Sequence, residues 1–146
     1  MRALLTPVAR LSELTAWRAA SANGKRRATS EAGATVVAIR PAEPRDAAPL
    51  VELTRAVETE EEGWLVGGPE WRDGKAARRY LRDARGRRDR AVIVAEGAGD
   101  VVGRLSLVRG RHAATEHVAT LAVIVARERR REGIGRALLA AAEAWA

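Results

Sequence analysis

The stretch from Leu121 to Trp145 constrains the fold of this chain most, because three kinds of local structure follow each other there without spare residues. An apolar run, typical of a buried strand, gives way to a charged run and then to two glycines, Gly133 and Gly135. An amphipathic segment rich in alanine and leucine follows and predicts a helix. This order aims a helix N-terminus and free backbone N–H groups at one point, an arrangement that commonly holds a phosphate.

Five residues of this turn are candidate phosphate ligands. Glycines at 133 and 135 remove Cβ atoms where a backbone must approach a pyrophosphate closely. Arg130, Arg131 and Arg136 add guanidinium groups that can bind phosphate oxygens in a bidentate manner. The alternative is an ordinary strand-to-helix turn that carries surface arginines.

The rest of the chain predicts a mixed α/β protein. The expected elements are a strand at 36–39, helices at 46–57 and 74–87, a hairpin of strands 91–96 and 101–108, a strand at 117–125 and a helix from 133 or 134 to the end. In the second hairpin strand, Leu105 and Leu107 alternate with Arg104 and Ser106. The order β-α-α-β-β-β-α predicts a largely antiparallel sheet flanked by helices.

The charge is unevenly spread along the chain. Residues 1–35 hold six cations and two carboxylates, a net charge of +4, whereas residues 36–146 have a net charge of only +3. A basic run, Lys25 to Arg27, and small polar residues predict a poorly ordered basic extension at 1–35, with a basic arm as the functional alternative. A single domain is expected to occupy residues 36–146.

The composition excludes several classes of protein. Without cysteine there is no disulfide framework, thiol nucleophile or cysteine-based metal site, and His112 and His117 alone make a poor metal site. No apolar run is long enough to cross a membrane, and no signal peptide is recognisable. We therefore expect a cytoplasmic protein that holds no metal.

Nearly all of the 26 cations are arginine, since only Lys25 and Lys75 are lysine. A GC-rich genome explains this preference for arginine as well as nucleic-acid binding would, so the preference alone does not indicate a nucleic-acid partner. Aromatic residues are not interleaved with the arginines, which argues against a nucleic-acid partner.

The segment Arg130-Arg131-Glu132-Gly133-Ile134-Gly135 fits the pattern Arg/Gln-x-x-Gly-x-Gly/Ala and resembles the acyl-CoA pyrophosphate loop of the GNAT superfamily of N-acetyltransferases. The resemblance extends over residues 36–146, including the opening AIRPAEPRDAAPLVEL and the hairpin AVIVAEGAGDVVGRLSL. It implies a GNAT-like fold and acetyl-CoA as cosubstrate. Two departures are Arg129, where an aromatic residue is frequent, and Arg131, where glycine is frequent.

The resemblance also implies which main-chain groups hold the pantetheine arm of acetyl-CoA. In the family, the fourth strand pairs with the pantetheine amides, and this role falls on Val123, Ile124 and Val125. The implied cofactor-binding set is Val123, Ile124, Val125, Arg130, Arg131, Gly133, Ile134, Gly135 and Arg136.

The catalytic groups are less evident from the sequence. An acceptor amine must lose a proton before it attacks the thioester, so a carboxylate or histidine is needed as a base. The family commonly has a glutamate on the fourth strand, and the matching residue here is Thr120, which cannot serve as a base. Glu116 and His117, at the start of that strand, are the candidate substitutes. A histidine bonded to backbone is the alternative for His117.

The family fold continues beyond its third helix into a fifth strand and a helix that bears a tyrosine acid. This chain is expected to stop before those elements, and its single tyrosine, Tyr80, falls on the second helix. The fourth strand is then expected to have an open apolar edge, through which two copies could pair as a homodimer.

Two functions follow from these expectations. The first is an acetyl-CoA-dependent N-acetyltransferase that moves an acetyl group to a primary amine by direct attack. The second is a non-catalytic CoA-binding or interaction module derived from a truncated GNAT domain.

Overall fold

The computed structural model describes residues 37–60 and 67–146, so the predicted extension at 1–35 lies outside the described residues. Four strands form an antiparallel sheet in the order β1-β2-β3-β4. The strands are β1 (Val37–Pro41), β2 (Arg90–Gly97), β3 (Asp100–Arg109) and β4 (Ala119–Val125). The helices are α2 (Ala47–Glu58), α3 (Gly74–Arg85) and α4 (Ile134–Trp145), with short 3₁₀ turns η1 (Pro44–Asp46), η2 (Pro69–Trp71) and η3 (Arg127–Arg129).

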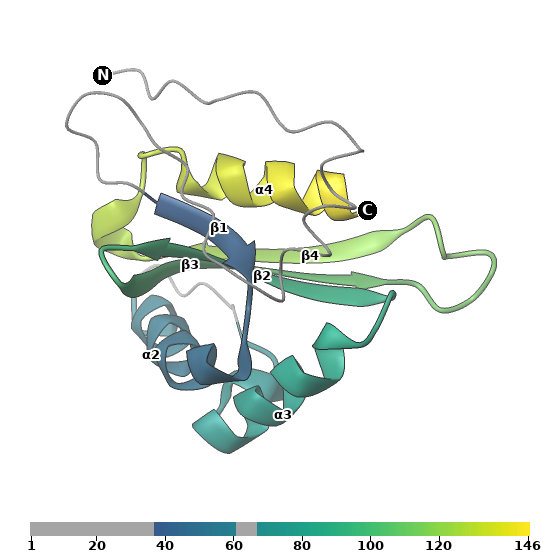
Figure 1. Cartoon of the computed structure of the whole chain (residues 1–146), viewed down its shortest axis with the longest axis horizontal. Helices are drawn as coiled ribbons and strands as arrows, with labels where there is room; N and C mark the ends of the chain where they lie inside the picture. Colours follow the sequence, from purple (N-terminus) through teal and green to yellow (C-terminus); the bar gives the residue numbers. More distant parts are fainter. Residues whose placement is uncertain (1–36, 61–66) are drawn as a thin grey trace.

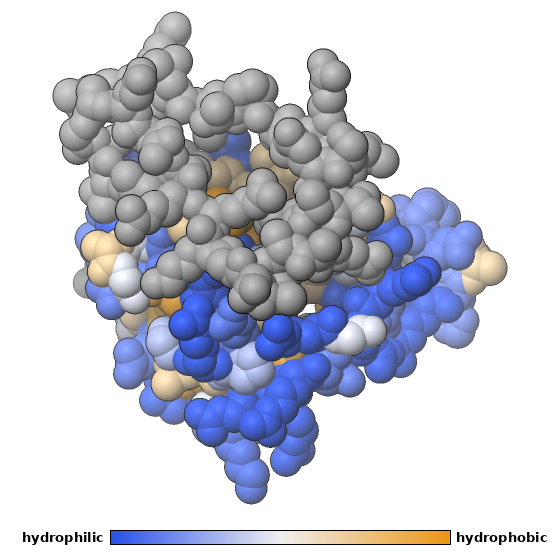
Figure 2. Space-filling view, viewed as in Figure 1, coloured by the Kyte–Doolittle hydropathy of each residue, from blue (hydrophilic) through white to orange (hydrophobic). Residues whose placement is uncertain are grey.

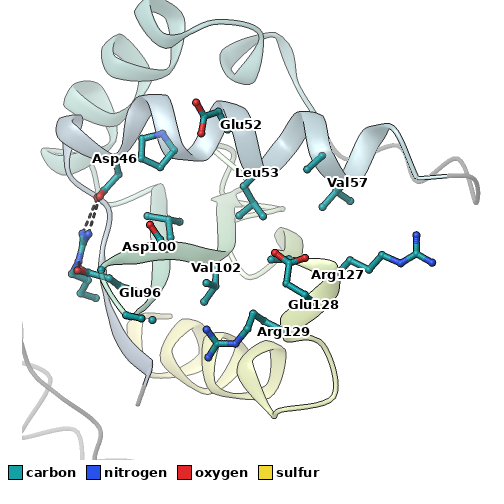
Figure 3. Close-up of a pocket in the computed structure, with 18 of the residues that line it drawn as sticks. Asp46, Glu52, Leu53, Val57, Glu96, Asp100, Val102, Arg127, Glu128 and Arg129 are labelled. Atoms are coloured by element: carbon teal, nitrogen blue, oxygen red, sulfur yellow. Dashed lines mark hydrogen bonds and ion pairs between the residues drawn. The ribbon is translucent and has the colours of Figure 1, made fainter. Parts of the chain in front are cut away.

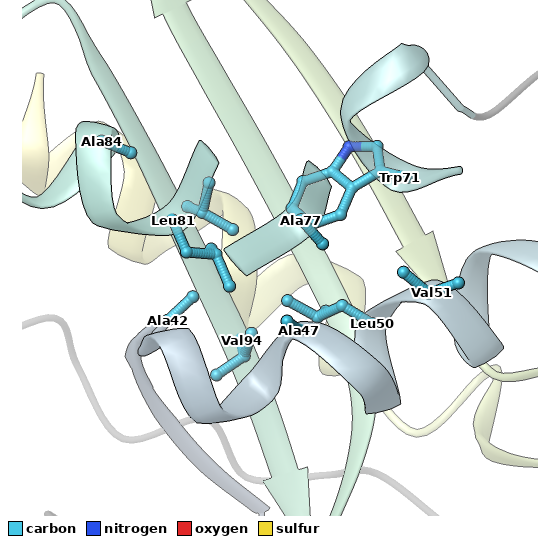
Figure 4. Packing of buried hydrophobic residues seen from close by; sticks show 10 residues of the cluster. Ala42, Ala47, Leu50, Val51, Trp71, Ala77, Leu81, Ala84 and Val94 are labelled. Carbon is cyan, nitrogen blue, oxygen red and sulfur yellow. The ribbon is translucent and has the colours of Figure 1, made fainter. Parts of the chain in front are cut away.

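Helices cover both faces of the sheet (Figure 1): α4 lies on one face, and α2 and α3 lie on the other. On the α4 face, Leu138 packs in one cluster with Ile93 and Leu105 of the sheet. On the opposite face, Leu50 and Leu81 pack in a second cluster (Figure 4) with strand and loop residues. Complete burial of a leucine contributes roughly 1.5–3 kcal/mol, so these two clusters fix α4 and the α2–α3 pair to the sheet.

Local sequence signals explain where several elements begin. The carboxylate of Asp73 accepts a hydrogen bond from the Ala76 N–H at 2.8 Å and caps α3, as its position predicts. Ala98 and Gly99 have φ values of +52° and +85°, the left-handed pair that a tight β2–β3 hairpin turn requires. The predicted order of strands and helices and the mixed, largely antiparallel class are confirmed.

The fourth strand is shorter than predicted. It begins at Ala119 rather than at residue 117, because the preceding residues form hydrogen-bonded turns instead. The Thr115 N–H donates to the His112 carbonyl oxygen at 2.7 Å. The Val118 N–H donates to the Thr115 carbonyl oxygen at 2.9 Å. Glu116 and His117 therefore lie in a turn beyond the strand.

Arg104 is completely buried, although it alternates with leucines on β3. Its guanidinium lies over the Trp71 ring, with 4.1 Å between the Arg104 Cζ atom and the ring centroid. Burial lowers the pKa of Arg104 to about 10. The alternation of leucines with polar residues along β3 therefore does not indicate a solvent-exposed face of the strand, because helices cover β3 on both faces.

A buried ion pair joins the end of β1 to the start of α2. Arg40 Nη1 and Nη2 each donate to one carboxylate oxygen of Asp46 at 2.8 Å. Glu96 of β2 accepts from Arg40 Nε at 2.8 Å. The Arg40 and Asp46 side chains are 11% and 6% exposed. This cluster fixes the first strand and helix against the hairpin.

One edge of β4 has no strand partner in the described part of the chain. Leu121 is 44% exposed and Val118, just before the strand, is 51% exposed. This agrees with the apolar edge expected from the sequence. No helix within residues 37–60 and 67–146 has the length and apolar character needed to cross a membrane.

Candidate functional site

Two residues in left-handed conformation shape the turn between β4 and α4. Arg131 has a φ of +62° and Gly133 a φ of +84°. Gly133 is the N-cap of α4, and its carbonyl accepts a hydrogen bond from the Ala137 N–H at 3.0 Å. The N–H groups of the three residues before Ala137 belong to the first helical turn, which has no internal acceptor for them. The turn thus presents amide donors and the positive end of the helix dipole.

Two arginines of this turn are available for an anion. Arg131 and Arg136 are exposed, and neither forms an ion pair with a carboxylate among the described residues. A guanidinium can bind two phosphate oxygens at once, and a helix N-terminus favours negative charge. The two arginines and the α4 N-terminus therefore form a candidate phosphate site.

Arg130, the third predicted phosphate ligand, is engaged by Glu60. Its Nη1 and Nη2 donate to the two Glu60 carboxylate oxygens at 2.7 Å each, and its Nε donates to the Val125 carbonyl oxygen at 3.1 Å. The Glu60 side chain is 11% exposed. The hydrogen bonds from Arg130 lower the pKa of Glu60 below that of an ordinary glutamate. A phosphate entering the turn would compete with this carboxylate for Arg130.

Gly135 has room for a side chain on the protein side. A Cβ atom built there would lie 3.9 Å from the nearest atom, Cγ2 of Val125, which is ordinary van der Waals contact. Internal packing therefore does not require glycine at this position. Because glycine has no side chain, it instead leaves the backbone of the turn accessible on the side where a pyrophosphate would approach.

Main-chain groups of β4 alternate between its two edges. The Ala126 N–H donates to Val102 of β3 at 2.8 Å, and the Val118 carbonyl accepts from Gly110 at 3.0 Å. In an antiparallel ladder, successive residues point in opposite directions, so Ile124 faces β3 and the backbone groups of Val123 and Val125 face the open edge. Of the three predicted pantetheine-binding residues, Val123 and Val125 thus present main-chain groups to that edge. Ile124 instead has a buried side chain, 4% exposed.

The candidate base residues lie apart from the phosphate site. Glu116 and His117 are exposed in the turn that precedes β4, whereas Gly133 follows the other end of this strand. The seven residues of β4 span roughly 20 Å at about 3.3 Å per residue. Thr120, at the family's glutamate position, is exposed on β4 between the two.

A cavity of about 1190 Å³ adjoins the turn on the α2 side. Figure 3 shows it between α2, the β2–β3 hairpin and η3. Its lining is mixed, with carboxylates and apolar side chains next to each other: Glu52, Asp100, Glu128, Leu53, Val57 and Val102. Glu60 also lines this cavity, so the Glu60–Arg130 ion pair connects it to the candidate phosphate site.

Arg129 packs the turn against the β2–β3 hairpin. Its Nη1 would lie 2.9 Å from a Cβ atom built at Gly97, so the guanidinium crosses the hairpin backbone closely. Its Nε donates to Glu132 at 2.8 Å. Arg129 stands at the sequence position where the resemblance leads one to expect an aromatic residue, and its flat guanidinium packs on the hairpin backbone there. Among the described residues, no group of three or more histidine, cysteine, aspartate or glutamate side chains could hold a metal ion.

These features define a class of α/β proteins in which a strand, a left-handed turn and a helix N-terminus form a candidate site for a phosphate-bearing ligand. The chain belongs to the acetyltransferase (GNAT) family, whose model matches residues 52–146. No curated protein matches the chain significantly.

Solved structures share this fold. A GNAT-family acetyltransferase from Streptococcus pneumoniae matches with a TM-score of 0.63 and 22% identity, covering 75% of this chain and 66% of that one. A ribosomal-protein-alanine N-acetyltransferase from Brucella melitensis matches with a TM-score of 0.57 and 33% identity, covering 73% and 65%. An acetyltransferase from Salmonella typhimurium, solved with its cofactor acetyl-CoA, matches with a TM-score of 0.58 and 26% identity, covering 74% and 62%. The chain thus spans 62–66% of the length of these proteins.

Proposed function

We propose that the domain is an acetyl-CoA-dependent N-acetyltransferase that moves an acetyl group to a primary amine. The observation that carries this proposal is the turn after β4, where two left-handed residues present the α4 N-terminus beside two exposed arginines, Arg131 and Arg136. Membership of the GNAT family supports it, as does the similarity to a protein solved with acetyl-CoA. This chain spans less than two thirds of the length of those proteins. The complete reaction, and not only its substrate, is therefore part of what we propose.

In this proposal the turn and β4 hold two adjoining parts of the cosubstrate, the pyrophosphate and the pantetheine arm. The first-turn N–H groups of α4, with Arg131 and Arg136, bind the pyrophosphate. Arg130 joins them once it leaves Glu60. The outward main-chain groups of Val123 and Val125 pair with pantetheine amides as a neighbouring strand would. Binding of both parts places the thioester along β4.

The chemical step is a direct acyl transfer. The neutral amine attacks the thioester carbonyl carbon, the carbonyl oxygen gains negative charge, and the C–S bond breaks to release the CoA thiolate. The nitrogen loses one proton, for which Glu116 or His117 is the proposed acceptor, and the thiolate takes up one proton. Backbone N–H groups near the carbonyl stabilise the oxyanion.

Two measurements test the proposal. Acetyl-CoA and CoA should each raise the melting temperature of the protein, because a ligand that binds only the folded state stabilises it. Release of free thiol from acetyl-CoA, followed with a panel of primary amines, should identify turnover. Glu116→Ala/His117→Ala is expected to reduce turnover by roughly 100-fold or more while the thermal shift with CoA persists. Absence of any shift in a folded sample would refute cofactor binding.

A second candidate function is a non-catalytic CoA-binding or interaction module. The placement of Glu116 and His117 favours it, because both are exposed in a turn at the end of β4 opposite the phosphate site. The same thermal shift is expected for this module, but no amine should produce thiol release. The two functions are therefore separated by turnover alone.

Replacing Glu60 should tighten cofactor binding. In Glu60→Gln the carboxylate that engages Arg130 is neutralised, so a pyrophosphate no longer displaces a competing anion. We expect roughly threefold to tenfold tighter CoA binding by isothermal titration calorimetry. Glu132→Gln is the matched control, since it removes a carboxylate from the same turn but leaves Arg130 bound to Glu60. Weaker binding in Glu60→Gln would mean that Glu60 orients Arg130 rather than competing for it.

A further inference from the structure

The outer surface of α3 and its flanks holds a concentration of positive charge that the proposed function does not use. Seven exposed cations occur between residues 72 and 88, and none forms an ion pair with a carboxylate among the described residues. We call them the α3 basic face: Arg72, Lys75, Arg78, Arg79, Arg82, Arg85 and Arg88.

The charge of this segment is not the effect of a uniform arginine bias. Residues 72–90 contain nine cations and three carboxylates, a net charge of +6. The remainder of residues 36–146 contains eleven cations and fourteen carboxylates, a net charge of −3. A compositional bias alone would have made both parts of the chain basic. The positive charge is instead concentrated on α3 and its flanks.

The local carboxylates do not neutralise the α3 basic face, because each has another partner. Asp73 caps the helix at the Ala76 N–H. Asp83 forms ion pairs with Arg87 and Arg90, which lie past the end of the helix. Asp89 likewise binds Arg87, at 2.9 Å, and this lowers the pKa of Asp89. Within the part of the chain that the structure describes, the helix therefore presents cations without carboxylate partners to solvent.

Four of these cations form one stripe along the helix. Lys75, Arg78, Arg82 and Arg85 follow each other at spacings of three, four and three residues, which place them on one side of an α-helix. At about 1.5 Å per residue the stripe is roughly 15 Å long. The buried side of the helix, which includes Ala77, Leu81 and Ala84, packs in the core. The space-filling view shows a hydrophilic surface in this region (Figure 2).

We propose that the α3 basic face binds the phosphate backbone of duplex nucleic acid without reading its sequence. Arginine suits this role because its guanidinium stays charged and binds phosphate oxygens in a bidentate manner. A row of cations on a rigid helix matches the regular row of phosphates along a duplex. Counterions released from the duplex then drive association.

The surface fits a duplex better than other polyanions. Single strands are held by stacking their bases on aromatic rings, but Trp71 is only 3% exposed and packs edge-on against Tyr80. An anionic membrane would favour a helix with an apolar face free to insert, whereas that of α3 is buried in the core. The absence of interleaved aromatics therefore argues against single strands and does not bear on duplexes.

This surface is separate from the candidate cofactor site. Figure 1 shows α3 on the face of the sheet opposite α4, and the phosphate site lies at the α4 N-terminus. Duplex binding by α3 does not require acetyl transfer, and CoA should not displace a bound duplex.

The test compares the full chain with two variants that each lose three positive charges. Arg78→Ala/Arg82→Ala/Arg85→Ala removes part of the α3 basic face, and alanine preserves helix propensity. Lys25→Ala/Arg26→Ala/Arg27→Ala is the control, because it changes net charge equally and leaves α3 intact. Binding to labelled DNA and RNA duplexes of about 20 base pairs is followed by fluorescence anisotropy over about 50–200 mM salt.

The unaltered chain should bind both duplexes with a Kd of roughly 1–100 µM near physiological salt, as expected of backbone contacts. The α3 variant should bind at least about tenfold more weakly, and its slope of log K against log salt should fall by about 2.7. The control should bind within about twofold of the unaltered chain, because the proposed contacts remain. A triple arginine-to-lysine variant at the same α3 positions should keep the slope, since its charge is unchanged.

Several outcomes would overturn the proposal. Equal weakening in both triple variants would show that net charge, rather than α3, causes binding. Tighter binding to vesicles of equal parts phosphatidylserine and phosphatidylcholine, at matched phosphate concentration, would make a membrane the partner. An unchanged thermal shift with CoA verifies that the α3 variant is folded. If that variant fails to fold, an arginine-to-glutamine triple replaces it, and a slope equal to that of the unaltered chain would refute the proposal.

Discussion

Replacing Gly135 by glutamate should abolish CoA binding, whereas replacing it by alanine, which adds only a methyl group to the surface that the pyrophosphate approaches, should weaken binding far less. The nearest atom to a Cβ at this position is 3.9 Å away, so alanine fits the fold. Glutamate adds a carboxylate in the first turn of α4, where the pyrophosphate would bind. Like charges placed together in this way cost several kcal/mol, which is a loss of at least about 100-fold in affinity.

Calorimetric titration with CoA measures both variants, and thermal unfolding without ligand serves as the control for folding. A negative charge near a helix N-terminus is favourable in the free protein, so Gly135→Glu should not lower the melting temperature. Equal CoA affinity in the glutamate and alanine variants would place the pyrophosphate elsewhere. Weak binding in the alanine variant would show that even one methyl group blocks the backbone approach.

Asp46→Ala should destabilise the fold more than any surface substitution. It leaves the Arg40 guanidinium buried without its bidentate partner, and breaking such a pair typically costs about 3–5 kcal/mol. It also removes the acceptor of the Glu43 N–H, which donates to Asp46 at 2.7 Å. Urea denaturation measures the change in the free energy of unfolding.

Two companion variants test the cause of this loss. Glu96→Gln removes the second carboxylate of Arg40, which forms one hydrogen bond and is 17% exposed, so its cost should be near 1 kcal/mol. Arg40→Met/Asp46→Ala/Glu96→Gln should be more stable than Asp46→Ala alone, because neither a half-paired buried cation nor an unpaired carboxylate remains. If the triple variant is the less stable of the two, loss of packing rather than an incompletely paired charge explains the effect.

The same ion pair predicts how stability depends on pH. The hydrogen bonds from Arg40 and from the Glu43 backbone lower the pKa of Asp46 despite the opposing effect of burial. A carboxyl group with a lowered folded-state pKa stabilises the fold above its unfolded-state pKa, and this contribution disappears as the pH falls through the folded value. Stability should therefore decline below about pH 4, and Asp46→Asn should weaken that decline.

Elements set by neighbouring residues could be predicted from the sequence. The strand, glycine turn and helix that end the chain follow from periodicity and from two glycines, and Asp73 caps α3 by its own side chain. The predicted start of β4 was wrong by two residues, because hydrogen-bonded turns at Thr115 and Val118 replace the first part of a sequence pattern that is otherwise typical of a strand.

Features that depend on packing between distant segments could not be predicted. Glu60 binds Arg130 across 70 positions of sequence, and neither residue signals the other. Arg104 follows an alternating pattern typical of a half-exposed strand, yet helices bury both faces of β3 and the guanidinium stacks on Trp71.

The left-handed conformation of Arg131 has a consequence for the stiffness of the turn. A side chain at φ +62° costs roughly 1–2 kcal/mol of torsional strain, which glycine would avoid. Glycine, however, is free to adopt many more backbone conformations, and a flexible turn loses that freedom when a ligand orders it. Arginine narrows the range of shapes that the turn can sample, but by itself it favours right-handed and extended backbone over the conformation found here. The surrounding structure must therefore hold Arg131 in this conformation, which places a cation on the turn.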